Sequence, residues 1–123
     1  MNTSRDMVQA AFKALDEKLA VDISVIDISQ VSVVADYFII AAGNSANQVQ
    51  AIADNVMEKM GRAGYDLRQV EGYQSARWIL LDYHDVVIHV FYQEDRRFYD
   101  LERIWRDGKF VDVNEFRQEE QEN

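Results

Sequence analysis

The chain has 123 residues, of which 48% are hydrophobic, with 22 acidic residues against 13 basic ones and no cysteine. This length is typical of one domain with one core. The excess of acidic residues disfavours direct binding to nucleic acid or to anionic membranes. The lack of cysteine excludes disulfides and thiolate metal sites, and no apolar run reaches the ~20 residues that span a bilayer, so we expect a soluble cytoplasmic protein.

The N-terminal third predicts one helix followed by two strands. Residues 3–19 carry apolar side chains at helical spacing, and Thr3 or Ser4 is placed to cap this helix. Residues 22–28 and 36–42 are short runs rich in Ile, Val and aromatic residues, which favours strands.

The turn Gly43-Asn44-Ser45 connects the second strand to a helix that we expect to extend to Gly61. Ser45 and Gln48 match a capping box, in which each side chain satisfies a free backbone N–H group. A strand-to-helix turn can also hold a phosphate, and nucleotidyltransferases use a similar Gly-Ser turn. Those enzymes need an Asp-x-Asp pair for metal ions, which this chain lacks. The pattern therefore favours a capped helix without a catalytic role.

Residues 66–73 are the most polar strand candidate and are expected at a sheet edge, before a hairpin over residues 76–91. Both strands of this hairpin are nearly continuous in apolar residues, which indicates burial on two faces. Alternation in the first strand divides its side chains into two sets. Trp78, Leu80 and Asp82 point one way, and Ile79, Leu81 and Tyr83 point the other way.

Residues 94–105 predict a last helix with an apolar stripe of Phe98, Leu101 and Trp105, and residues 109–113 an extended stub. The order of elements predicts an α/β domain over residues 1–113, built as a mixed five-stranded sheet with helices packed on its faces. Residues 114–123 are polar and acidic, and we expect a disordered tail.

Catalytic patterns are weak in this sequence. His84 and His89 are the only histidines and lack metal-ligand spacing, so a zinc site is disfavoured. A triad of Ser75, His89 and Asp85 lacks a nucleophile elbow. Arg96 and its neighbour Arg97 lie among five acidic residues, which favours a solvated, salt-bridged helix face over a nucleic-acid patch.

The aromatic residues suggest an interaction surface. Trp and Tyr are the residues that most often dominate protein–protein interfaces. The set consists of Tyr37, Trp78, Tyr83 and Tyr99. Trp78 in a strand is more often a core residue, but the polar neighbours Glu71, Arg77 and Asp82 favour an exposed anchor with a charged rim.

Several blocks of the chain together resemble the ribosomal silencing factor family, also called Iojap-like proteins, in the order expected between Met7 and Trp105. The blocks are Asp36-Tyr37-Phe38-Ile39-Ile40, Gly43-Asn44-Ser45 with Gln48-Val49, Glu71-Gly72, Trp78-Ile79-Leu80-Leu81-Asp82-Tyr83, Asp85-Val86-Val87-Ile88-His89-Val90-Phe91, and Arg97-Phe98-Tyr99-Asp100-Leu101-Glu102 with Trp105.

This resemblance implies a nucleotidyltransferase-like sheet without the catalytic carboxylates, no cofactor and no enzymatic activity. It also implies binding to the large ribosomal subunit through large-subunit ribosomal protein fourteen, which blocks joining of the small subunit and represses translation. Trp78 and Leu80 are the expected anchors, and Asp82, Asp85 and Glu71 would face basic side chains of the partner. The matching blocks add Tyr83 and Tyr99 to the expected partner-binding residues.

Two alternatives stay open from the sequence. One is a nucleotidyltransferase-type or metal-dependent enzyme that uses Asp82, Asp85 and His89. The other is a self-associating module, in which Trp78 packs against its copy in a homodimer.

Overall fold

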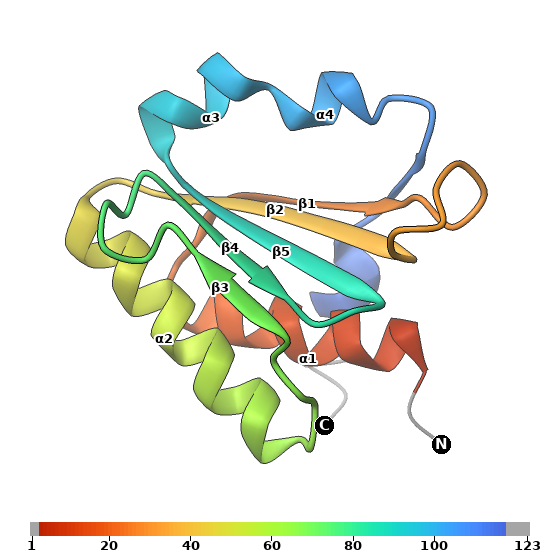
Figure 1. Ribbon diagram of the computed structural model, residues 1–123, viewed down its shortest axis with the longest axis horizontal. Helices are drawn as coiled ribbons and strands as arrows, with labels where there is room; N and C mark the ends of the chain where they lie inside the picture. Colours follow the sequence, from red (N-terminus) through yellow and green to blue (C-terminus); the bar gives the residue numbers. More distant parts are fainter. Residues whose placement is uncertain (1–2, 118–123) are drawn as a thin grey trace.

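The computed structural model describes residues 3–117, which form one mixed sheet with helices on both of its faces (Figure 1). The elements in chain order are α1 (Ser4–Glu17), β1 (Val21–Asp27), β2 (Tyr37–Gly43), α2 (Ala46–Arg62), β3 (Gln69–Glu71), β4 (Trp78–Asp82), β5 (Val86–Tyr92), α3 (Gln93–Tyr99), α4 (Leu101–Ile104) and β6 (Lys109–Val111). In this part of the chain, no helix is both long and apolar enough to cross a membrane.

The sheet has the strand order β3-β4-β5-β2-β1-β6, in which β2 and β5 are parallel and the other neighbours are antiparallel. The predicted β4–β5 hairpin and the edge position of the polar strand β3 are therefore confirmed. The prediction of five strands is wrong. The expected stub at Lys109 pairs with the outer edge of β1, where Ile26 lies opposite Phe110. Three residues are too short a pattern to predict a strand without the edge that they pair with.

The helices α1 and α2 cover one face of the sheet and bury the larger core against it. Thr3 caps α1 in a capping box with Asp6. Ser45 caps α2, since its hydroxyl oxygen accepts a hydrogen bond from the backbone N–H of Gln48. The predicted box is incomplete, because the Gln48 side chain accepts from the N–H of Asn44 at 2.7 Å and not from that of Ser45.

The helices α3 and α4 lie over the opposite face (Figure 1). The prediction of one continuous helix over residues 94–105 is wrong, because Asp100 adopts a left-handed backbone with φ of 47° and ends α3. The break lets Leu101 pack on the sheet and brings Trp105 against Phe38, with ring centroids 5.0 Å apart. Phe98, predicted for the same buried stripe, is instead 81% exposed.

The chain continues its packing beyond the predicted domain end at residue 113. Residues 114–117 form a short helical turn, and Phe116 is 1% exposed with its ring centroid 5.7 Å from that of Phe12. The prediction of disorder is therefore wrong for residues 114–117, because one aromatic side chain reaches the core beside α1. The rest of the predicted tail, residues 118–123, lies outside the described residues.

Candidate functional site

The strand β4 divides its side chains between the two faces of the sheet as its alternation predicts. Ile79 and Leu81 are fully buried on the α1–α2 side. Trp78 and Leu80 lie on the α3–α4 side and are only half-buried. Asp82 follows in the same alternation and is also half-buried.

The strand register brings the predicted residues of this face together. Glu71 of β3 lies opposite Leu80 of β4, which in turn lies opposite His89 of β5. Trp78 lies opposite Phe91 in the same ladder. Paired residues of an antiparallel ladder share one face, so Glu71, Leu80 and Trp78 belong to one continuous surface.

Trp78 packs against other aromatic side chains but is not fully buried in the core. Its ring centroid lies 4.9 Å from that of Phe91 and 4.8 Å from that of Tyr99. Its indole N–H donates a hydrogen bond to Nδ1 of His89 at 3.0 Å. These contacts fix the ring, while its half-buried state leaves part of it accessible to a partner.

Tyr99 extends the aromatic surface from α3, and its side chain is 43% exposed. Phe98 continues it, because the Phe98 and Tyr99 ring centroids lie 5.2 Å apart. The sequence pattern missed Phe98, since helical periodicity assigned it to the core stripe. We define the docking surface as the following six residues: Glu71, Trp78, Leu80, Asp82, Phe98 and Tyr99.

The acidic members of the docking surface keep their charge available. None of the ion pairs found among residues 3–117 involves Glu71 or Asp82. Glu71 is exposed, and Asp82 uses one carboxylate oxygen to accept the backbone N–H of His84 at 2.8 Å. A carboxylate with no cation beside it is free to attract a basic side chain of a partner.

Two predicted site residues lie elsewhere. Tyr83 is 3% exposed and packs with Ile79 and Leu81 on the α1–α2 side, so its prediction as part of the docking surface is wrong. Burial raises the pKa of its hydroxyl to about 12. Asp85 is exposed at the β4–β5 turn, where its backbone oxygen accepts from the N–H groups of Asp36 and Tyr37. Asp85 therefore lies at the end of the hairpin, outside the paired residues of β4 and β5.

The residues weighed for catalysis have structural contacts. Ser75 donates its hydroxyl to the backbone oxygen of Gly72 at 3.2 Å, and His89 is 4% exposed and engaged by Trp78, so the triad with Asp85 is not assembled. Across residues 3–117, no group of three or more His, Cys, Asp or Glu side chains is arranged to hold a metal ion.

The start of α2 borders an open cavity of about 350 Å³ that also includes Ser75, Arg77 and Tyr92. Two backbone N–H groups at this turn have side-chain partners, because the Ser45 hydroxyl accepts from the N–H of Gln48 at 3.1 Å and the Gln48 side chain accepts from the N–H of Asn44. This geometry favours the capping role of Ser45 over a phosphate site.

The predicted salt-bridged face of the last helix is present only in part. Arg96 is buried and pairs with Glu102 at 2.9 Å. Arg77 of the preceding loop pairs with Asp95 at 3.1 Å. Arg97 is exposed and takes part in none of the ion pairs found among residues 3–117.

Comparison of the sequence with known families gives a match over residues 1–123 to the family described as "Ribosomal silencing factor during starvation". Among curated proteins, the "Ribosomal silencing factor RsfS" of Bacillus subtilis is 41% identical over 110 residues, which cover 89% of this chain and 93% of that protein. The mouse "Mitochondrial assembly of ribosomal large subunit protein 1" is 31% identical, with 80% of this chain and 44% of that protein covered.

Solved structures share this fold. A crystal structure of a protein from Chromobacterium violaceum superposes with a TM-score of 0.83 at 35% identity, covering 85% of this chain and 87% of that one. A crystal structure from Bacillus halodurans gives a TM-score of 0.79 at 37% identity, covering 88% of this chain and 98% of that one.

Proposed function

The chain belongs to the ribosomal silencing factor family, and from this premise we propose that it binds the large ribosomal subunit and prevents the small subunit from joining it. The direct partner in this proposal is large-subunit ribosomal protein fourteen. The protein then represses translation by obstruction, without covalent chemistry and without a cofactor. Its place of action is the cytoplasm, where a ribosomal partner would be met.

One observation carries this proposal: a half-buried tryptophan with part of its ring accessible lies among further apolar side chains, and carboxylates without an ion-pair partner lie beside them. Trp78, Leu80 and Tyr99 supply the contact area that dominates protein interfaces. Glu71 and Asp82 flank them and take part in none of the ion pairs of residues 3–117. Ribosomal proteins are basic, so this surface and the net charge of −9 favour their approach.

The layered fold supports obstruction as the mechanism. The docking surface lies on the α3–α4 side of the sheet, and α1 and α2 lie on the opposite side (Figure 1). A partner bound at the docking surface would therefore leave the α1–α2 layer projecting away from it. In this proposal, that layer occupies space that the small subunit needs in order to join.

The test is a subunit-joining experiment with purified components. Large and small subunits are mixed with and without the protein, and the particles are separated on a sucrose gradient. We expect joined ribosomes to decrease as the protein is added, with the protein migrating with large subunits only. Joining that is unaffected at saturating protein would contradict the proposal. Titration against isolated protein fourteen then measures the direct contact.

The likeness of the sheet to nucleotidyltransferases and the formation of a homodimer remain part of the proposal. Both outer strands, β3 and β6, are three residues long and have one free edge each in the described chain. Self-association there would leave the docking surface open, because the surface lies on a face of the sheet. Sedimentation at two protein concentrations distinguishes a monomer from a dimer.

A further inference from the structure

The helix α3 carries Phe98 and Tyr99 of the docking surface but has little to hold it in place. It is seven residues long, and α4 is four residues long, so neither is stable by its own backbone hydrogen bonds. Among the seven residues of α3, Arg96 is the only one that is buried. Two further contacts of α3 lie at the surface, between Asp95 and Arg77 at 3.1 Å and between Gln93 and Asp22 at 3.4 Å. The position of α3 on the sheet therefore depends mainly on what the buried Arg96 contacts.

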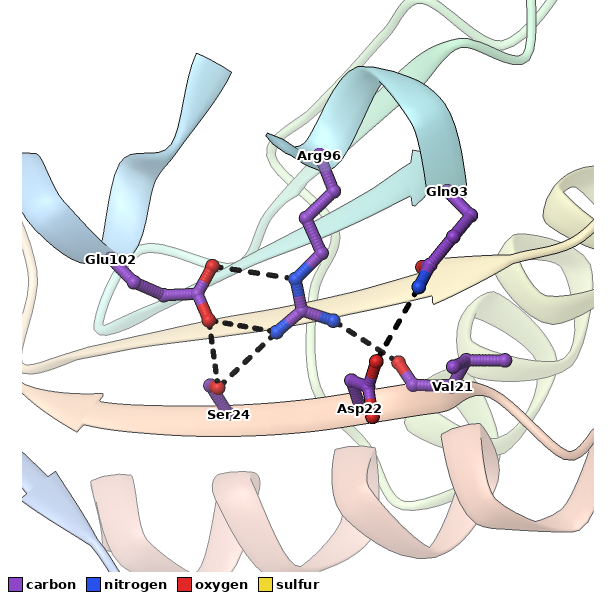
Figure 2. Close-up of polar contacts among 6 residues, drawn as sticks. All are labelled: Val21, Asp22, Ser24, Gln93, Arg96 and Glu102. Carbon is purple, nitrogen blue, oxygen red and sulfur yellow. Dashed lines mark hydrogen bonds and ion pairs between the residues drawn. The ribbon is translucent and has the colours of Figure 1, made fainter. Parts of the chain in front are cut away.

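The Arg96 guanidinium joins three elements of the fold, and Figure 2 shows it between α3, α4 and β1. Its Nε and Nη2 atoms donate to the two carboxylate oxygens of Glu102 at 3.3 and 2.9 Å. Its Nη1 atom donates to the backbone oxygen of Val21 at 3.2 Å, and Nη2 also reaches the hydroxyl of Ser24 at 3.3 Å. The Ser24 hydroxyl in turn donates to the Glu102 carboxylate at 3.1 Å, so both members of the charged pair form hydrogen bonds with β1.

The network bridges the break in the chain at Asp100. Arg96 comes before the break and Glu102 after it, so their two-point contact fixes the angle between α3 and α4. Arg96 and Tyr99 are three residues apart and are neighbours on the helix surface. With Arg96 held on β1, Tyr99 lies on Trp78 of β4, with ring centroids 4.8 Å apart.

We infer that the Arg96–Glu102 pair is a positioning clamp, which holds Tyr99 against Trp78 and so forms the docking surface before the partner arrives. This inference rests on the proposed function, because it specifies how the same surface is made ready for a basic ribosomal protein. A surface that is already ordered binds more tightly, since less side-chain and backbone freedom is lost on association.

The rest of the fold has its own anchors on this face. Leu101 is 9% exposed, and Trp105 packs on Phe38. Loss of the clamp should therefore free α3 locally while the sheet and α4 stay in place. A loss of order confined to α3 would distinguish a positioning role of the clamp from a general contribution to stability.

The test compares Arg96→Met with Arg62→Met, which breaks the exposed Arg62–Glu58 pair of α2 at 2.8 Å and serves as the matched control. Binding to isolated large-subunit protein fourteen is measured by titration calorimetry. We expect the Arg96 variant to bind roughly tenfold more weakly, from the cost of ordering α3 and its side chains on binding. The Arg62 variant should bind like the wild type. Equal affinities of all three proteins would overturn the inference.

Hydrogen exchange supplies a readout that a purely structural role would not give. We expect the amides of α3 to exchange faster in Arg96→Met, while those of β4 and β5 keep the wild-type protection. Uniformly faster exchange over the whole sheet would instead show general destabilisation and overturn the inference. If Arg96→Met does not fold, Glu102→Gln replaces it, because the shape of the side chain is kept and the charge pair is lost.

A double-mutant cycle gives the decisive comparison. If Arg96 acts through Tyr99, the change Arg96→Met should have almost no further effect on affinity once Tyr99→Ala is present. Independent, additive losses would overturn the inference. Failure of the wild type to bind protein fourteen would count against the proposed function, whereas a binding wild type with unaffected clamp variants counts against the clamp alone.

Discussion

The indole N–H of Trp78 donates a hydrogen bond to Nδ1 of His89, 3.0 Å away, and joins β4 to β5 beneath the docking surface. Because Nδ1 accepts, the neutral imidazole carries its proton on Nε2, which is buried and has no hydrogen-bond partner among residues 3–117. Burial lowers the pKa of His89 from its ordinary 6.5 to about 4. The orientation of the proposed anchor therefore depends on a histidine that stays neutral.

This depressed pKa predicts a loss of stability in acid. Between pH 6.5 and pH 4 the unfolded chain binds a proton that folded His89 does not, so the free energy of unfolding falls as the pH falls. From pH 7 to pH 5 the loss due to this one group is about 2 kcal/mol. Urea unfolding of the wild type and of His89→Asn at both pH values measures it, because Asn keeps an acceptor for Trp78 but does not titrate. A His89→Asn protein that loses as much stability between pH 7 and pH 5 as the wild type would contradict this assignment.

Trp78→Ala should weaken binding to large-subunit protein fourteen while the fold is kept. Truncating an aromatic anchor costs about 2 kcal/mol or more, which is about thirtyfold in affinity. Affinity is measured by titration calorimetry and the fold by circular dichroism. Tyr65→Ala is the control, because Tyr65 is a partly buried aromatic residue packed against the α1–α2 core and should leave affinity unchanged. An unfolded Trp78→Ala protein would assign Trp78 to the core instead of the interface.

Removing the charges of Glu71 and Asp82 should slow association more than it speeds dissociation. Unpaired carboxylates at the rim attract a basic partner over a distance, so we expect the double variant Glu71→Gln and Asp82→Asn to associate roughly three- to tenfold more slowly at low salt. Stopped-flow mixing at several salt concentrations measures the rate. Glu58→Gln removes a charge from the exposed surface of α2 and should have no effect. A salt dependence identical to that of the wild type would exclude this steering role.

Gly72 allows the backbone to approach Trp78 closely, and Gly72→Ala should disturb the docking surface. A Cβ atom there would lie 2.1 Å from the backbone oxygen of Trp78, at φ of 79°. We expect the free energy of unfolding to fall by about 2 kcal/mol or more. A Cβ atom added at Gly61 inside α2 has no other atom within 4 Å. The change Gly61→Ala should therefore raise the free energy of unfolding by roughly 0.5–1 kcal/mol. Urea unfolding compares the two, and equal stability of both variants would argue against the close approach.

Local patterns in the sequence were sufficient for much of the fold. The β4–β5 hairpin, the edge strand β3, the caps at Thr3 and Ser45 and the two faces of β4 all follow from residue types at short spacing. The same alternation predicts that Tyr83 and Trp78 lie on different faces of the sheet. The prediction of Tyr83 as a surface residue came from its residue type and from the family resemblance, whereas the structure places it on the face that the alternation predicts.

The remaining features depend on neighbours that are distant in sequence. Strand β6 exists because β1 has a free edge, and Phe116 is buried because Phe12 lies beside it. Periodicity alone placed Phe98 in the core, but the backbone reversal at Asp100 leaves it 81% exposed.

The sequence by itself determined the order and type of most elements, the acidic character and which side chains of β4 lie on each face of the sheet. Only the tertiary structure decided that α3 ends at Asp100, that Tyr99 covers Trp78 and that Arg96 is held by Glu102 on β1. The physical reason is that periodicity and capping act over a few residues. The position of a seven-residue helix is set instead by contacts with strands more than ten residues away along the chain.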